Sequence, residues 1–238
     1  MAVALILAGG SGTRLGADIP KQYIEVYGRC VISYCIERLS CHEKIDRIQI
    51  VAQAQWHEKI KECLEAYDKN GKFRGFSVPG RNRQLSIYNG LSDMKEYVDN
   101  LDVVLVHDAA RPLLSERMIT NCLEAIRGYD GVVPVLPMKD TVYQSADGKK
   151  ISALVKRSEI FSGQAPEAFR FGVYYEANRR LLPDTILTIN GSTEPAVMAG
   201  LDMIMIAGDE DNFKITTKED LERFRELIKR RNNNTGER

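Results

Sequence analysis

The chain has 238 residues, of which 44% are hydrophobic and 28% charged, and this length is enough for one sizeable core in a single domain. Lysine and arginine total 33, as do aspartate and glutamate, so the net charge is zero. Without a global basic field we expect no nucleic-acid partner and no membrane partner, and a phosphorylated ligand would need a local basic pocket.

Short β-prone runs alternate with helical stretches along the chain. The first run, residues 3–7, is continuously apolar, which suits a strand buried on both faces. Further β-prone runs lie at 48–51, 103–106, 132–135 and 203–206, and helix-like stretches lie at 31–39, 55–66, 85–97 and 116–126. This alternation predicts an α/β fold with an open, Rossmann-like, mostly parallel sheet flanked by helices.

The apolar start of the chain and its cysteines indicate the compartment. Residues 1–7 are too short for a signal peptide, and no apolar run approaches the roughly 18 residues that span a bilayer. The cysteines are odd in number, form no CxxC pair and lie near no histidine at metal-ligand spacing: Cys30, Cys35, Cys41, Cys63 and Cys122. We therefore expect a soluble cytoplasmic protein with reduced thiols.

A glycine-rich segment follows the first predicted strand directly. Residues 7–16 read LAGGSGTRLG, and residues 20–23 read PKQY. Glycines let backbone N–H groups approach a phosphate without obstruction by a Cβ atom, although the spacing matches neither the P-loop nor the GxGxxG motif. Two cations, Arg14 and Lys21, bracket the loop, which could then hold a triphosphate and neutralise charge on the phosphorus under attack. A plain strand–turn–helix junction is the alternative.

This pattern, GGxGxRxG followed by PKQY, resembles the nucleotidyltransferases of the 2-C-methyl-D-erythritol 4-phosphate and ribitol-5-phosphate cytidylyltransferase family. The resemblance covers about residues 3–227, with the motifs in their expected order. It implies the nucleotide-diphospho-sugar transferase type of fold and a loop that cradles the phosphates of CTP. Arg14 and Lys21 would stabilise the pentacovalent transition state. The loop residues expected to bind the nucleotide are Leu7, Ala8, Gly9, Gly10, Ser11, Gly12 and Thr13.

A second segment, residues 80–91, reads GRNRQLSIYNGL and looks like the base-recognition segment of that family. The resemblance implies that the backbone around Gly80 and the hydroxyl of Ser86 read the cytosine edge, with Arg81 and Arg83 beside the nucleotide. Apart from the resemblance, Ser86 would simply be a hydroxyl at the start of a helix.

A third segment, VHDAARP at 106–112, follows a predicted buried strand. Its carboxylate, Asp108, would lie at the edge where open α/β sheets bind ligands, and a hard carboxylate beside a triphosphate suits Mg²⁺. Asp108 could equally cap the next connection. The resemblance implies that Asp108 lies near the metal and the acceptor, and that Arg111 shapes that site. His107 would be structural, because a phosphate-monoester nucleophile is already ionised and needs no general base.

Residues 140–155 break the alternation. Asp-Gly at 147–148, between two β-prone segments, predicts a hairpin that projects as an arm over about residues 138–163. The hairpin either packs on its own chain or serves dimerisation. The resemblance implies that Thr141 and Arg157 reach the acceptor in a neighbouring subunit, with Arg157 on its phosphate, and therefore a homodimer.

The C-terminal part carries one further motif, NFKIT at 212–216, which resembles a family motif whose lysine contacts phosphate. Lys214 thus joins Arg14 and Lys21 as a catalytic candidate. In a strand, a lysine between two apolar residues would be unusual unless it pointed into a polar site; a solvated edge lysine is the alternative. Residues 1–228 are expected to form one nucleotidyltransferase domain, and the polar residues 229–238 to fray.

The resemblance implies a cytidylyltransferase that transfers CMP from CTP to a sugar-alcohol phosphate, with Mg²⁺ as cofactor and pyrophosphate as product. The opening LAGGxGTR and the pair at 163–164 favour the ribitol-phosphate branch, whereas VHDAARP and residues 139–141 favour the methylerythritol branch. We expect D-ribitol 5-phosphate as the acceptor, with 2-C-methyl-D-erythritol 4-phosphate as the alternative.

Two segments depart from the family pattern. The usual Gln-Thr-Pro-Gln appears as QAPE at 164–167, and an acidic Thr-Asp-Asp/Glu-Ala segment is replaced by GSTEPA at 191–196. A sugar-1-phosphate nucleotidyltransferase would share the loop but is usually longer. A non-catalytic nucleotide-binding regulator could lose Arg14 or Lys21, and both are present.

Overall fold

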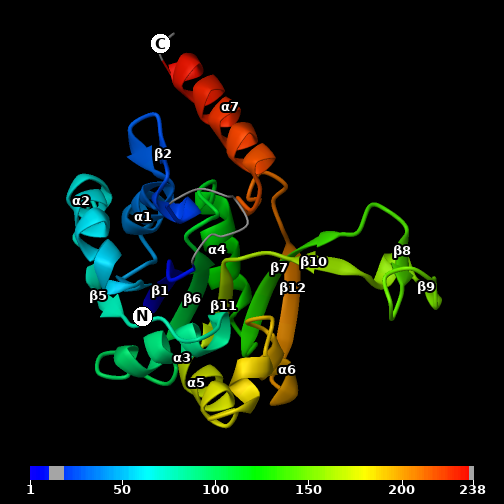
Figure 1. Cartoon of the computed structure of the whole chain (residues 1–238). Coiled ribbons are helices and arrows are strands. Elements are labelled where there is room, and N and C mark those ends of the chain that lie inside the picture. The colour runs from blue at the N-terminus through cyan, green and yellow to red at the C-terminus, as the bar shows by residue number, and fades with distance from the viewer. Residues whose placement is uncertain (11–18, 236–238) are drawn as a thin grey trace.

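An eight-stranded sheet forms the centre of the molecule (Figure 1). The computed structural model describes residues 1–10 and 19–235. The strands of this sheet are β1 (Ala2–Leu7), β4 (Arg47–Val51), β5 (Phe73–Ser77), β6 (Val103–Asp108), β7 (Gly131–Pro137), β10 (Phe161–Gly163), β11 (Glu167–Arg170) and β12 (Met203–Ala207). Their order is β10-β7-β11-β6-β1-β4-β5, with β12 also paired to β7.

The predicted, mostly parallel sheet is confirmed, with three strands that the sequence did not predict, β5, β10 and β11. Strand β1 pairs in parallel with β4 and β6, β4 with β5, and β7 with β12. All five β-prone runs of the sequence are strands of this sheet. Strand β11 was not predicted, and it runs antiparallel between β6 and β7. A four-residue strand with a charge at each end carries no periodic signal that could have revealed it.

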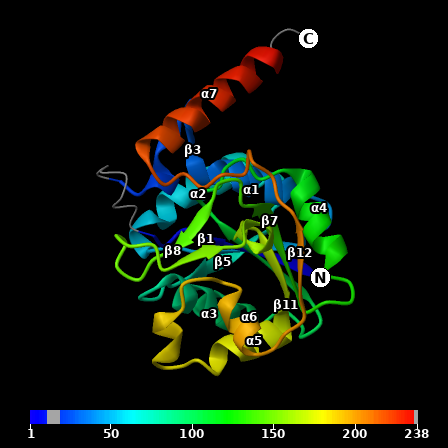
Figure 2. The ribbon, with the colours of Figure 1, turned by 90° about the vertical axis from the view of Figure 1, so that its right-hand side faces the viewer.

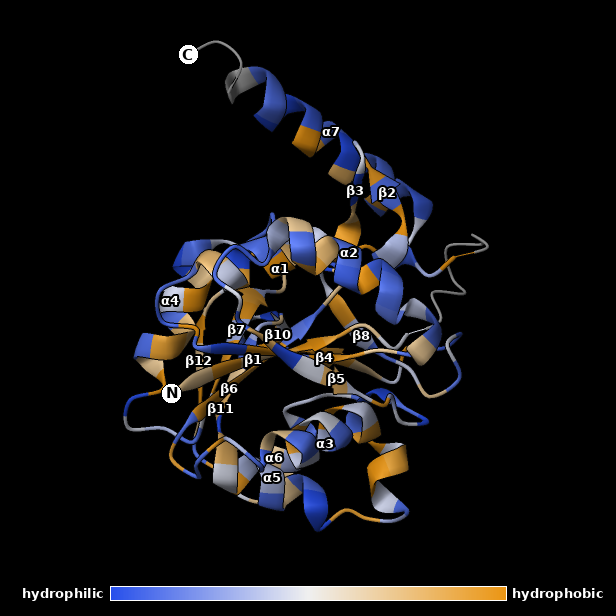
Figure 3. Ribbon diagram, turned by 90° about the vertical axis from the view of Figure 1, so that its left-hand side faces the viewer, coloured by the Kyte–Doolittle hydropathy of each residue, from blue (hydrophilic) through white to orange (hydrophobic). Residues whose placement is uncertain are grey.

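Helices cover both faces of the sheet (Figure 3). The α-helices are α1 (Val31–Cys41), α2 (His57–Tyr67), α3 (Arg83–Met94), α4 (Glu116–Ala125), α5 (Phe171–Arg179), α6 (Glu194–Met198) and α7 (Lys218–Thr235). Helices α1, α2 and α4 lie on one face, and α3, α5 and α6 on the other. Side chains of β1 alternate between two cores, with Ala4 and Ile6 in the first and Val3 and Leu5 in the second.

Short elements complete the chain. The 3-10 helices are η2 (Lys21–Tyr23), η3 (Ala54–Trp56), η4 (Arg157–Glu159) and η5 (Thr185–Thr188), and the small antiparallel pairs are β2 (Glu25–Val26) with β3 (Arg29–Cys30) and β8 (Val142–Gln144) with β9 (Ala153–Val155). The β8–β9 pair is the predicted hairpin, and it projects from the body as an arm (Figure 1). Its side chains Tyr143 and Leu154 are 56% and 67% exposed.

Helix α7 corrects the expectation of a frayed tail from residue 229. It continues to Thr235 and extends away from the sheet (Figure 1, Figure 2). Its start is a capping arrangement, in which the Asp220 carboxylate accepts from the backbone N–H of Thr217 at 2.9 Å. Phe224 and Ile228 are buried in a third apolar cluster, and this packing, together with the high helix propensity of Lys and Arg, carries the helix past residue 229.

The cysteines are all free in this structure. All five lie in the described part of the chain and none forms a disulfide. No cluster of three or more potential metal-binding side chains occurs among residues 1–10 and 19–235. Within the same residues, no helix combines the length and the apolar character that crossing a membrane requires.

Candidate active site

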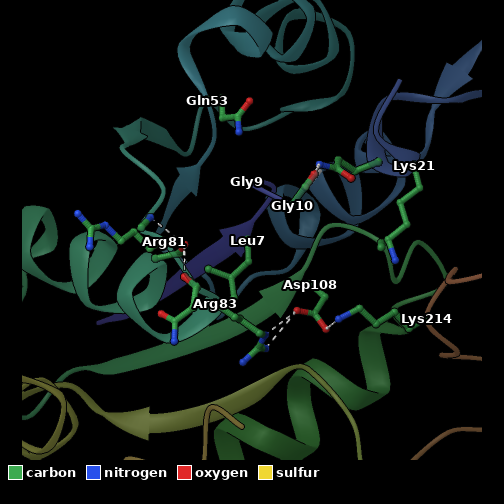
Figure 4. A pocket seen from close by; sticks show the side chains of 14 residues that line it. Leu7, Gly9, Gly10, Lys21, Gln53, Arg81, Arg83, Asp108 and Lys214 are labelled. Carbon is green, nitrogen blue, oxygen red and sulfur yellow. Dashed lines mark hydrogen bonds and ion pairs between the residues drawn. The ribbon is translucent and has the colours of Figure 1, made fainter. Parts of the chain in front are cut away.

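A pocket of about 520 Å³ opens at the C-terminal ends of β1 and β6 (Figure 4). These strands are parallel neighbours with Leu7 opposite Asp108, so both end at the same edge of the sheet. Ten residues predicted from the sequence line this pocket: Leu7, Gly9, Gly10, Lys21, Gly80, Arg81, Arg83, Ser86, Asp108 and Lys214. Residues that are far apart in the chain thus meet in one cavity. Four of the predicted residues, Ser11, Gly12, Thr13 and Arg14, lie outside the described residues, so their roles stay predictions.

Side chains of the 3-10 helix η2 hold the first glycines of the loop by hydrogen bonds to backbone carbonyl oxygens. The Gln22 side-chain amide donates to the carbonyl oxygens of Ala8 at 2.7 Å and Gly10 at 2.8 Å, and the Tyr23 hydroxyl donates to Ala8 at 2.9 Å. A Cβ atom on Gly9 would lie 2.6 Å from the Cβ of Pro79, so this position requires glycine. Ala8 itself is buried and contributes its carbonyl to this anchor.

Gln22 was missed in the sequence because its role is visible only in three dimensions. It is 3% exposed overall, yet it also lines the pocket. The signal was its place beside Lys21 in the PKQY motif. Other lining residues that the sequence did not single out are Gln53, Asn82 and Ala110.

Asp108 lies close to three cations from three segments of the chain. Figure 4 shows two of them, Arg83 and Lys214. The Arg83 guanidinium, at the start of α3, donates to Oδ1 from Nε at 3.2 Å and from Nη2 at 3.1 Å. Lys214 Nζ donates to Oδ2 at 2.9 Å, and Arg111 Nε lies 3.6 Å from the same oxygen. Arg111 also donates to the carbonyl of Asn212 at 2.7 Å, which fixes the segment that carries Lys214. The Asp108 side chain is therefore an ion-pair centre and not a helix cap.

The charge of this cluster is strongly positive. Burial raises the pKa of the Asp108 carboxyl, but the charges of Arg83 and Lys214 outweigh burial and hold that pKa well below its usual range. Asp108 is therefore ionised at neutral pH. Three cations against one carboxylate leave two positive charges at the pocket wall, which suits a phosphate.

Asp108 does not fit the predicted role of a Mg²⁺ ligand in this arrangement. A carboxylate has about four acceptor sites on its two oxygens. Arg83 makes two contacts with Oδ1 and Lys214 makes one with Oδ2, while Arg111 Nε lies 3.6 Å from Oδ2 as a third positive charge that disfavours a metal cation there. Asp108 is also the only carboxylate among the described residues that line the pocket. The donor set thus serves to position cations.

Ser86 is not the N-cap of α3. The N-cap is Asn82, whose side chain accepts from Leu85 N at 2.8 Å. The Ser86 hydroxyl instead accepts from Gly80 N at 2.9 Å and donates to the Asn82 carbonyl at 2.8 Å. The Ser86 hydroxyl thus ties the backbone of Gly80 to the first turn of α3, and both residues line the pocket. Arg81, the neighbour of Gly80, is exposed at the rim of the pocket.

The segment around Lys214 corrects one expectation. Residues 213–216 form no strand, but Lys214 does point into the polar site, as the sequence argument required. The bond from Ile215 N to the Ala110 carbonyl, 2.8 Å long, holds the segment beside the end of β6. His107 agrees with a structural role: it is fully buried, its Nε2 lies 3.1 Å from the Arg111 carbonyl, and burial lowers its pKa to about 4.

The structure does not bring Thr141 and Arg157 to this pocket. Both are exposed, and neither lines the cavity. Arg157 lies in η4 at the base of the arm, where its guanidinium donates to the Lys139 carbonyl at 2.8 Å. Their role at an acceptor site in a neighbouring subunit stays a prediction.

Comparison with known proteins gives the family. A family model described as IspD, 2-C-methyl-D-erythritol 4-phosphate cytidylyltransferase, matches residues 2–230. The chain is 36% identical over 223 residues to the bifunctional enzyme IspD/IspF of Granulibacter bethesdensis, covering 92% of this chain and 54% of the relative. It is 33% identical to the 2-C-methyl-D-erythritol 4-phosphate cytidylyltransferase of Clostridium beijerinckii, with coverage of 93% and 95%. It is 28% identical to the ribitol-5-phosphate cytidylyltransferase of Lactiplantibacillus plantarum, with coverage of 97% and 100%. The chain thus spans about half the length of the bifunctional relative and almost all of the other two.

Solved structures give the same result. The crystal structure of 4-diphosphocytidyl-2C-methyl-D-erythritol synthase from Anaerococcus prevotii superposes with a TM-score of 0.81 at 27% identity, covering 96% of each chain. This likeness confirms the Rossmann-like α/β fold, and the relatives are nucleotidyltransferases by name. The chain therefore belongs to the IspD family of cytidylyltransferases, whose family model is that of 2-C-methyl-D-erythritol 4-phosphate cytidylyltransferase.

Proposed function

We propose that this chain transfers CMP from CTP to a sugar-alcohol phosphate and releases pyrophosphate. The observation that carries the proposal is the combination, in one pocket, of the anchored glycine loop with Lys21 and of the Asp108-centred cluster with Lys214. Two phosphorylated substrates need two adjacent places for negative charge, and this pocket offers both. Figure 4 shows Lys21 and Lys214 approaching the same space from different segments.

The nucleotide would occupy the glycine-loop side. Gln22 and Tyr23 turn the carbonyls of Ala8 and Gly10 toward η2, away from the phosphates, so that N–H groups of the loop can face them. On the other side, the Gly80 carbonyl would accept from the exocyclic amino group of cytosine. A uracil carries a carbonyl at that position and would be disfavoured there.

The acceptor phosphate would bind on the Asp108 side. Its oxygen attacks the α-phosphorus of CTP in line, and the pyrophosphate leaves from the opposite side. A phosphate monoester is already ionised, so no general base is needed, and buried His107 with its pKa of about 4 is not placed to act as one. Catalysis then consists of positioning and of stabilising charge by Lys21 and Lys214, with no covalent enzyme intermediate.

We rank 2-C-methyl-D-erythritol 4-phosphate as the first candidate acceptor and D-ribitol 5-phosphate as the second. The sequence motifs alone favoured the opposite order. The change rests on the relatives: three named for the former are 31% to 33% identical to this chain and a fourth is 29% identical, whereas two named for the latter are 28% and 29% identical. The second acceptor is kept because the ribitol-phosphate relatives match 97% or more of this chain.

The proposal also involves two components other than this single chain, a metal ion and a second subunit. Mg²⁺ stays the predicted cofactor and would enter with the triphosphate oxygens of CTP, and Asp108 is not proposed as its ligand. A homodimer formed through the arm would bring Thr141 and Arg157 of one subunit to the pocket of the other. The exposed apolar side chains Tyr143, Ile151 and Leu154 support an arm that packs against a second copy.

Pyrophosphate release tests the function. The chain would be assayed with CTP, UTP or GTP, with each of the two polyol phosphates, and with and without Mg²⁺. We expect turnover with CTP, and a kcat/KM for the methylerythritol phosphate at least about tenfold above that for ribitol phosphate. The reverse ratio would establish the second acceptor. Turnover with a sugar 1-phosphate alone, or with no acceptor at all, would contradict the proposed function.

A further inference from the structure

A second carboxylate, Glu167, lies on the same face of the sheet as Asp108. Strand β11 runs antiparallel to β6 with Glu167 directly opposite Val106, and Asp108 lies two residues further along β6. Side chains two residues apart on a strand share a face, and diagonal neighbours across an antiparallel pair are about 7–8 Å apart. Glu167 therefore lies one row deeper in the sheet than Asp108, beneath the cation cluster.

Hydrogen bonds fix Glu167 in this position. The Ser192 hydroxyl donates to Glu167 Oε2, and the Tyr174 hydroxyl donates to the Ser192 carbonyl at 2.8 Å. Gln84, the neighbour of Arg83 in α3, donates to the Tyr174 hydroxyl at 3.3 Å. The two segments that depart from the family pattern, at 164–167 and 191–196, thus contact each other through Glu167 and Ser192.

The charged or titratable groups whose charges act on Glu167 come from several elements: Arg83 from α3, Asp108 from β6, Arg111 from the connection after β6, Lys214 from the segment before α7 and Tyr174 from α5. Cys122 of α4 interacts with the charge of Glu167 from the opposite face of the sheet. The ion pairs that the described residues form in this cluster all go to Asp108, and none to Glu167.

Glu167 therefore has no direct ion-pair partner among the described residues, and the cations of the cluster act on its charge only from a distance. Burial, opposed by the charge of Arg83 and reinforced by that of Asp108, raises the pKa of Glu167 to about 7. The family's usual glutamine at this position would carry no charge at any pH.

Building on the proposed function, we infer that Glu167, held by Ser192, is a positioning residue that controls the net charge of the cation cluster and thereby its affinity for an acceptor phosphate. The cluster carries two positive charges when Glu167 is protonated and one when Glu167 is ionised. A divalent anion bound at Arg83, Arg111 and Lys214 repels the ionised carboxylate and draws a proton from solvent onto Glu167. Binding is then coupled to the uptake of as much as one proton.

The direction of the pH effect follows. Below pH 7 Glu167 is protonated and does not oppose the anion. As the pH rises through about 7, Glu167 ionises, and the affinity falls by at most tenfold per pH unit. Replacement of Glu167 by glutamine should remove this fall while keeping the shape of the side chain.

Sulfate binding to the full chain, measured by calorimetry at pH 6 and pH 8, tests the inference. Sulfate stays divalent over this range and needs no turnover. We expect Kd to rise at least about fivefold from pH 6 to pH 8 in the unmodified chain, and by less than about twofold in Glu167→Gln. Ser192→Ala removes a hydrogen-bond donor that favours the ionised carboxylate. In this variant Glu167 should therefore ionise at a higher pH, and the Kd for sulfate should begin to rise at that higher pH. Glu176→Gln, a surface carboxylate of α5 paired with Arg179 and Arg180, should keep the unmodified rise.

The outcomes separate this inference from the proposed function. Equal rises in the unmodified chain and Glu167→Gln, or no sulfate binding at pH 6, would overturn the inference. Normal sulfate results without pyrophosphate release would instead overturn the proposed function and leave the role of Glu167 in anion binding standing. In the active enzyme, KM for the acceptor should rise more steeply with pH than KM for CTP, and a parallel rise of both would contradict a role specific to the acceptor.

Discussion

The wall of the pocket around Asp108 and the β8–β9 arm were both assigned to the acceptor, yet they are built in opposite ways. At the wall, one carboxylate, 10% exposed in its side chain, fixes three cations that lie up to 106 residues from it in the sequence. On the arm, Thr141 and Arg157 are exposed and lie outside the cavity. A single chain therefore completes the cation-lined wall by itself, whereas the arm would have its predicted function only beside a second copy.

Lys21→Ala should show the largest effect, because Lys21 belongs to the part of the site that one chain completes. Removal of one group that stabilises transition-state charge costs about 3–4 kcal/mol, so kcat should fall about 10² to 10³-fold in the pyrophosphate assay. Lys59→Ala is a matched control, since Lys59 pairs with Glu25 at 2.6 Å and lies outside the pocket lining. Near-normal turnover of Lys21→Ala would remove Lys21 from the mechanism.

Asp108→Asn tests whether the negative charge of Asp108 stabilises the three cations of the pocket wall. Three cations would lose their counter-ion, and the free energy of unfolding should fall by about 3 kcal/mol, the lower end of the range for a broken buried pair, because Arg83 and Lys214 are partly exposed. Denaturant unfolding at pH 7 measures this change. An unchanged stability would show that the cations do not need Asp108.

The stability of the unmodified chain and of Asp108→Asn should also differ in its dependence on pH. The pKa of Asp108 is lower in the folded chain than its ordinary value of 3.8, so its stabilising contribution is present above that value and is lost as the pH falls below it. The stability advantage of the unmodified chain over Asp108→Asn should therefore shrink steadily as the pH falls from about 4 to about 2, and part of it should remain at pH 2 because the folded-state pKa lies lower still. An advantage that stayed constant between pH 6 and pH 2 would contradict the assignment.

Arg157→Ala tests the predicted role of the β8–β9 arm at the acceptor. Arg157 is exposed, and its guanidinium bonds to a backbone carbonyl, so stability should change by less than about 0.5 kcal/mol. KM for the acceptor should rise at least about tenfold, with KM for CTP unchanged, if the arm reaches the pocket of a partner. Lys156→Ala, which breaks an exposed pair with Glu159, is the control on the same arm. An effect confined to CTP would place the acceptor phosphate elsewhere.

Tyr23→Phe should give the smallest effect. It removes only the hydroxyl that donates to the Ala8 carbonyl, and a single hydrogen bond contributes about 1 kcal/mol, so KM for CTP should rise about fivefold with kcat little changed. Tyr34→Phe removes a similar bond, from a tyrosine hydroxyl to the Val26 carbonyl, away from the glycine loop. Equal effects of the two variants on KM would show that the anchor stabilises the fold without serving the nucleotide.

Local sequence determined the frame of this protein. Continuous apolar runs such as residues 103–106 specify buried parallel strands, because period and side-chain type are properties of a few adjacent residues. Asp-Gly likewise specified the hairpin. Asp108 could be placed at the sheet edge before the structure was known, since a residue that follows a buried parallel strand has few other places to lie.

Tertiary structure alone decided what surrounds Asp108. The sequence placed Arg83 beside the nucleotide, but packing of α3 against the sheet places its guanidinium on Asp108, and both Asp108 oxygens are thereby occupied. The insertion of β11 between β6 and β7, which no periodic pattern announces, brings Glu167 beneath the same cluster and next to Ser192. Such contacts depend on strand order and register, which are set by the burial of the whole sheet and not by any one segment.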